Sequence, residues 1–64
     1  MKIIIDNRSK LPIHEAMDFA NKIIQDAAKD RKYCACTTWE VFNIGVYAIQ
    51  NKKSVRIVVF NLLK

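Results

Sequence analysis

Two cysteines and a single histidine are the side chains with the most specific chemistry in this 64-residue chain. Cys34 and Cys36 are separated by one residue, so on a strand both thiols would project from the same face. A structural zinc site needs four ligands, and His14 is the only histidine that could add to the two thiols. Redox chemistry is typical of a Cys-x-x-Cys pair, and this spacing differs. We therefore expect no metal and no cofactor, and reduced thiols packed as small apolar side chains.

His14 has Glu15 beside it, which raises the question of a catalytic pair. Neighbouring residues on a helix point about 100° apart, so the two side chains would diverge. No Ser, Cys or Asp is placed by its spacing to complete a relay with them. The sequence predicts no catalytic residues and a protein that is not an enzyme.

Basic residues form the third chemical group. The net charge is +5, and residues 31–64 hold six basic residues against Glu40 alone. A basic cluster can contact phosphates in a salt-dependent way that ignores base sequence, or it can dock an acidic protein surface. No aromatic residue is interleaved to stack a base. The basic patch that we predict at one end of a sheet consists of Arg31, Lys32, Lys52, Lys53 and Arg56.

A helix is the clearest of the elements that must position these side chains. Apolar residues recur with the period of a helix that packs on a core, and Pro12 suits its first position. The opposite face carries mixed charge and is expected to face water. Residues 2–6, with three consecutive isoleucines, are predicted to form a short strand before the helix. The recurring residues are Ile13, Ala16, Met17, Ala20, Ile23, Ile24, Ala27 and Ala28.

After residue 30 the composition favours strands, because aromatic, β-branched and thiol residues accumulate. We predict strands over residues 32–39, 46–50 and 55–62, with turns near residues 43–45 and 51–54. The alternative is a helix, since Thr37-Thr38-Trp39-Glu40 matches a capping box before an apolar stretch. The poor helix propensity of Val, Phe, Ile and Gly in that stretch favours the strands.

This order of elements predicts one α+β domain over residues 1–64, a strand, a helix and three strands, with the helix packed on one face of a mainly antiparallel sheet. The last strand is apolar on both faces, and one helix covers only one of them. Four large apolar side chains left in water forgo about 6–12 kcal/mol, whereas a domain of this size has a margin of about 3–5 kcal/mol. We therefore expect the uncovered face to bind a partner. The residues predicted for this interface are Ile4, Trp39, Val58, Phe60 and Leu62.

Three stretches of the chain resemble segments of a known group of proteins. They are Lys2-Ile3-Ile4-Ile5-Asp6-Asn7-Arg8-Ser9, Tyr33-Cys34-Ala35-Cys36-Thr37-Thr38 and Asn51-Lys52-Lys53-Ser54. They look like parts of short uncharacterised proteins encoded by phages and prophages of low-GC Gram-positive bacteria. The likeness spans most of the chain. It implies a small accessory protein of a mobile element, a class that often binds and blocks host proteins, and it assigns no role to any single residue.

Together these observations predict a cytoplasmic binding protein without catalytic activity. No apolar run approaches the roughly 18 residues of a membrane span, and Asp6 interrupts the first apolar run too early for a signal peptide. Its partner would be a second copy, most simply in a homodimer, or a host protein that it inhibits. The alternative function is a nucleic-acid-binding module that uses the basic patch.

Overall fold

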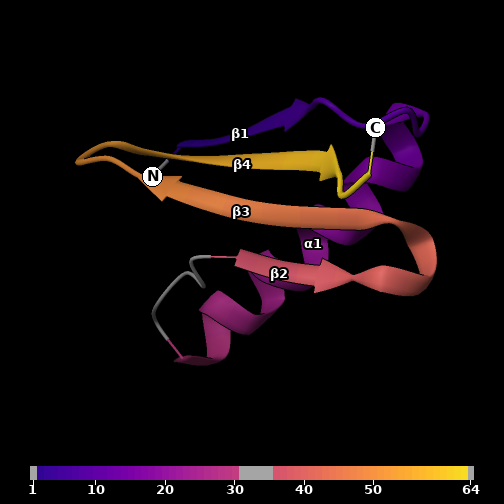
Figure 1. Ribbon diagram of the computed structural model, residues 1–64. Helices are drawn as coiled ribbons and strands as arrows, with labels where there is room; N and C mark the ends of the chain where they lie inside the picture. Colours follow the sequence, from indigo (N-terminus) through magenta and orange to yellow (C-terminus); the bar gives the residue numbers. More distant parts are fainter. Residues whose placement is uncertain (1, 31–35, 64) are drawn as a thin grey trace.

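The computed structural model describes residues 2–30 and 36–63. Its elements follow in the order β1 (Lys2–Asn7), α1 (Ile13–Asp30), β2 (Cys36–Trp39), the single 3-10 turn η1 (Glu40–Phe42), β3 (Ile44–Gln50) and β4 (Ser54–Asn61). The four strands form one sheet, and α1 lies across one of its faces (Figure 1). The predicted α+β class, with one helix on a mainly antiparallel sheet, is confirmed.

The strand order in the sheet is β1-β4-β3-β2, so the last strand of the chain is central. β1 runs parallel to β4, with Ile3 beside Val55 and Ile5 beside Ile57. β3 is antiparallel to both of its neighbours, β4 and β2. The sequence left this order open. Because β4 is central, it is covered on both edges, which suits its nearly continuous apolar sequence.

Helix α1 packs on the sheet through a stripe of small side chains. Ala16, Ala20 and Ala27 are buried, together with Ile23. Alanine at these positions lets the helix backbone approach the β-branched side chains of the sheet closely. The sheet side of this core consists of Ile44, Val46, Val55, Ile57 and Val59. The core therefore uses only part of the predicted stripe, because Ile13 and Met17, 55% and 43% exposed, and the exposed Ala28 lie outside it.

The connection from β1 to α1 is held by side-chain hydrogen bonds. The Asn7 side-chain amide donates to the Leu11 carbonyl at 2.8 Å, and its carbonyl accepts from the backbone N–H and the hydroxyl of Ser9. Such Asx turns are a common reason for asparagine in a tight connection. The carbonyl of Pro12 accepts from the N–H groups of Glu15 and Ala16, so the helix begins one residue after the proline.

The segment between β2 and β3 differs in part from the expectation. The capping-box residues Thr37 and Thr38 lie in β2, and the alternative helix shrinks to the one turn of η1. Asn43 ends that turn with a φ of 59°, the left-handed conformation that asparagine tolerates better than most residues. β3 therefore begins at Ile44, two residues earlier than predicted.

Candidate protein-binding surface

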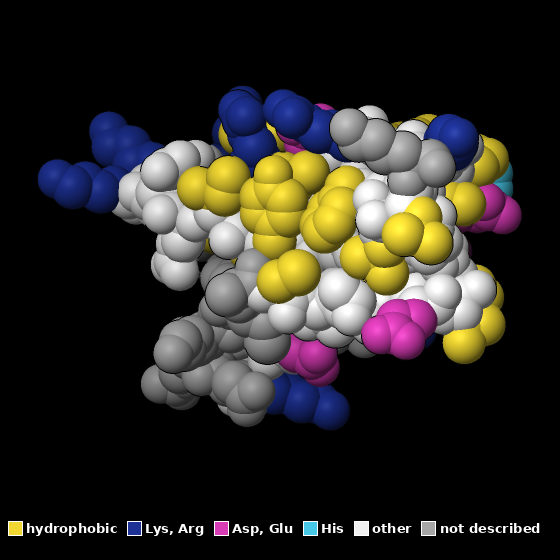
Figure 2. All heavy atoms as spheres, viewed as in Figure 1, with side chains coloured by type: hydrophobic (Ala, Val, Ile, Leu, Met, Phe, Trp, Pro, Cys, Tyr) yellow, Lys and Arg dark blue, Asp and Glu magenta, His cyan; other side chains and the backbone are white. Residues whose placement is uncertain are grey.

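The face of the sheet opposite α1 carries a second set of apolar side chains, which we call the open face. Side chains alternate along a strand, and Val55, Ile57 and Val59 point into the core with α1. Val58 and Phe60 therefore point the other way. The strand register places Tyr47 beside Val58, and Ile4 and Ile49 on either side of Arg56. Figure 2 shows hydrophobic side chains gathered along the middle of this face.

The apolar side chains of the open face partly cover one another. Val58 is only 2% exposed although it lies on the open face, whereas Ile49 is 45% exposed. Ile4, Tyr47 and Phe60 are half-buried. The exposed surface of this face therefore consists mainly of Ile49 and of parts of Ile4, Tyr47 and Phe60. The cost of leaving this face in water is correspondingly smaller than the sequence alone suggested.

Gly45 and Phe60 are matched across the open face. They are paired in register, and the Phe60 ring lies so close over Gly45 that an added Cβ would stand 2.5 Å from Cζ. The same ring contacts Tyr47, with 5.6 Å between centroids and a tilt of 55°. Glycine in a strand often marks such a close approach. The two tilted aromatic rings and the glycine thus form a continuous apolar area.

Of the predicted interface residues, Ile4, Val58 and Phe60 share the open face, and Trp39 does not. Trp39 is paired with Ile44, which is a core residue, so it points toward the helix side. There its ring lies 5.1 Å from that of Phe19. The prediction for Trp39 is wrong, because the 3-10 turn and the earlier start of β3 set a register that the sequence did not reveal. Leu62 follows β4, and its N–H donates to the Asn43 carbonyl at 3.0 Å.

The members of the predicted basic patch that the structure describes lie at the β3–β4 hairpin and at the start of β4. Lys52 and Lys53 are exposed in the turn, and the N–H of Lys2 donates to the carbonyl of Lys53 at 3.1 Å. Arg56 is exposed on the open face, two residues into β4 from Ser54. Figure 2 shows lysine and arginine side chains at this end. Arg31 and Lys32, the other predicted members of the patch, lie outside the described residues.

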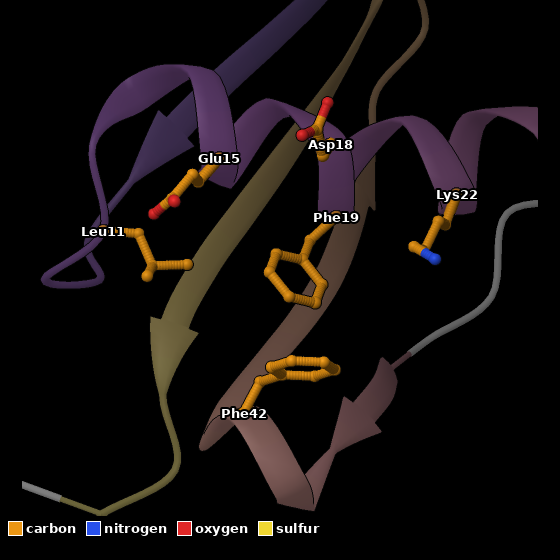
Figure 3. A pocket seen from close by; sticks show the side chains of 6 residues that line it. All are labelled: Leu11, Glu15, Asp18, Phe19, Lys22 and Phe42. Carbon is orange, nitrogen blue, oxygen red and sulfur yellow. The ribbon is translucent and has the colours of Figure 1, made fainter.

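The hollow on the helix side offers little chemistry. It measures about 440 Å³ and is bordered by Phe19 and Phe42 (Figure 3). The two rings make an edge contact, with 5.6 Å between their centroids. Glu15, Asp18 and Lys22 stand at its rim beside Leu11. Two carboxylates and an ammonium on an open rim are solvated side chains, with no nucleophile among them.

Among the described residues, the side chains of Cys36 and His14 take no part in a cluster of metal ligands. Cys36 is free and exposed, so the expectation that it packs as a small apolar side chain is wrong; Cys34 lies outside the described residues. His14 is exposed on α1. Within residues 2–30 and 36–63, no group of three or more His, Cys, Asp or Glu side chains could hold a metal ion.

Sequence reasoning missed a second exposed apolar group at the other end of the sheet. Val41 is 93% exposed on η1, next to the exposed Phe42. Leu63 is held nearby by two hydrogen bonds to the Asn43 side chain. The Leu63 N–H donates to Asn43 Oδ1 at 2.8 Å, and the Leu63 carbonyl accepts from Asn43 Nδ2 at 3.2 Å. The turn predicted near residues 43–45 was the available sequence signal here, and it did not indicate that Val41 and Phe42 would be exposed.

In the part of the chain that the structure describes, no helix has the length and apolar character that crossing a membrane requires. Comparisons of this chain with protein-family models, with curated proteins and with solved structures found no match.

Proposed function

We propose that this chain is a binding protein without catalytic activity that docks a partner protein on the open face of its sheet. One observation carries the proposal: Ile4, Ile49 and Phe60 line a sheet face that α1 leaves uncovered. An apolar patch rimmed by polar residues is typical of a protein interaction site. Flat aromatic rings such as Tyr47 and Phe60 are well suited to anchor such a contact.

The charges on the open face define the chemistry of the partner. Arg56 stands between Ile4 and Ile49, and Lys2, Lys52 and Lys53 are exposed at the same end. The complementary surface is an apolar strip with carboxylates at one end, which would pair with the guanidinium and ammonium groups. The resemblance to phage-encoded accessory proteins supports a host protein as the target, and its function would be blocked by occupation of that surface.

A pair of single substitutions tests this proposal. Ile49→Asp places a charge on the open face near the β3–β4 hairpin, at a side chain that is already 45% exposed, so the fold is retained. Val41→Asp makes the same chemical change at the opposite end of the sheet. We expect wild type and Val41→Asp to retain the same host protein in a quantitative pull-down, and Ile49→Asp to lose it while its circular dichroism spectrum still shows a folded protein. Equal retention by all three proteins would contradict the proposal.

A second candidate function, nucleic-acid binding, is favoured by the position of Lys2, Lys52, Lys53 and Arg56 at one end of the sheet. Four phosphate contacts would make the affinity fall steeply with salt. Titration of labelled DNA and RNA at about 50 mM and about 200 mM salt measures this slope. Replacing Lys52 and Lys53 by serine should then weaken binding to every sequence alike. Absence of binding at the lower salt concentration would eliminate this candidate.

A further inference from the structure

Strand β1 is an edge of the sheet, and its free edge displays regular backbone groups. The hydrogen bonds that frame its pairing with β4 come from the N–H groups of Lys2 and Arg8, to the carbonyls of Lys53 and Val59. Backbone groups alternate in direction along a strand. The backbone N–H and carbonyl groups of the even-numbered residues therefore face β4, and those of Ile3, Ile5 and Asn7 face outward.

This edge has the features of a pairing site. β1 has six residues and β2, the opposite edge, has four. Ile3 is 41% exposed on the helix side of the edge, next to the half-buried Ile5. An edge strand with unpaired backbone groups and large apolar side chains is a template for another strand.

We propose that β1 pairs with the β1 strand of a second copy of this chain, antiparallel and centred on Ile4. In this register Ile3 lies opposite the partner's Ile5, and these residues are the ones whose backbone groups face outward. Each of the two Ile3–Ile5 pairs exchanges two hydrogen bonds. Ile4 meets the partner's Ile4 on the two-fold axis. Lys2 lies opposite the partner's Asp6, and this opposite-charge pair occurs twice.

The charges of β1 select this register over its neighbours. Pairing can slip only by steps that keep the outward-facing residues opposite one another. A slip in one direction places Lys2 opposite the partner's Arg8 and Ile4 opposite the partner's Asp6. A slip in the other direction places Lys2 opposite the partner's Ile4 and leaves Asp6 without a partner. Opposite charges directly across an antiparallel pair stabilise it, and like charges destabilise it.

The proposed dimer has closed two-fold symmetry, and the side chains that it pairs are accessible to a second copy. The two-fold axis is perpendicular to the sheet, so the two four-stranded sheets join into one and both helices lie on the same side. Asp6 already pairs with Arg8, at 3.1 Å between Nε and Oδ2, and the partner's Lys2 would reach its other side. This dimer leaves both open faces free, so it does not depend on the proposed function.

Charge reversal tests the register directly. Lys2→Asp places a carboxylate opposite the partner's Asp6, and Asp6→Lys places an ammonium opposite the partner's Lys2. We expect each substitution to raise the dimer Kd about tenfold or more. The double variant Lys2→Asp/Asp6→Lys should dimerise again, and an equimolar mixture of the two single variants should form heterodimers. Sedimentation equilibrium from about 1 µM to about 1 mM protein measures these masses.

Two controls keep the result interpretable. Lys52→Asp makes the same charge change in the exposed hairpin turn and should leave the dimer unchanged. A synthetic chain with an N-methyl group on Ile3 removes an outward donor without changing any side chain, and it should be monomeric with a normal circular dichroism spectrum. A wild-type monomer throughout the concentration range would overturn the proposal. A dimer that survives both the charge reversals and N-methylation would overturn it as well.

Discussion

Replacing Ile57 by alanine measures how much of the stability comes from the helix side of the sheet. Ile57 is fully buried on β4, beside Ile5 of β1 and Ala48 of β3. Truncating a buried isoleucine costs about 2–5 kcal/mol, because contacts are lost and a cavity remains. The whole domain is expected to have a stability of about 3–5 kcal/mol. We therefore expect Ile57→Ala to be largely unfolded in water at 25 °C.

The matched control is the same substitution on the other face of the neighbouring strand. Ile49 of β3 is 45% exposed and pairs with Arg56 of β4. It directly follows Ala48, the residue of β3 that pairs with Ile57. Only about half of its side chain leaves a buried environment, so Ile49→Ala should cost about 1 kcal/mol. With a urea m-value of about 1 kcal/mol/M, its midpoint falls by about 1 M in a denaturation curve followed by circular dichroism. Equal losses for the two variants would refute the assignment of the two faces.

Three further substitutions probe local features. Gly45→Ala should lower the free energy of unfolding by about 1–3 kcal/mol in urea denaturation, because the new Cβ displaces the Phe60 ring. The same substitution should cost far less in a Phe60→Ala background, and equal costs would show that the two positions are not coupled. Asn43→Ala should cost about 1–2 kcal/mol more than Asn43→Gly, since only glycine keeps the left-handed backbone without strain, and both should speed deuterium exchange at the Leu63 amide. Asn7→Ala should lower stability by about 1–2 kcal/mol in thermal denaturation through the lost hydrogen bonds of the β1–α1 connection, and an unchanged melting curve would contradict that role.

The helix and the fold class could be predicted because their sequence patterns are local. Ala16, Ala20 and Ile23 repeat with the helical period, and the structure buries all three. The two faces of β4 were also readable, since alternation along a strand follows from its pleat. These features depend on residues that are near each other in the chain.

The position of Trp39 could not be predicted, because it depends on a register set by distant residues. A strand shifted by one residue presents every side chain on the other face. Here η1 and the left-handed Asn43 shorten the connection, which pairs Trp39 with Ile44 and turns its ring toward Phe19. The burial of Val58 was equally hidden, because its paired neighbours Asp6 and Tyr47 belong to other strands. The strand order also depends on these long-range pairs.

The parallel pairing of the first strand with the last has a kinetic consequence. During synthesis the three isoleucines of β1 emerge before their hydrogen-bonding neighbour, which is made from residues 54–61. Until those residues leave the ribosome, β1 has no strand to pair with, and its isoleucines can contact only α1 or other nascent chains. Contacts of such long sequence separation slow folding because a large loop must close before they form. The rate-limiting event is therefore expected to be the insertion of β4 between β1 and β3, in a single late step that completes the sheet.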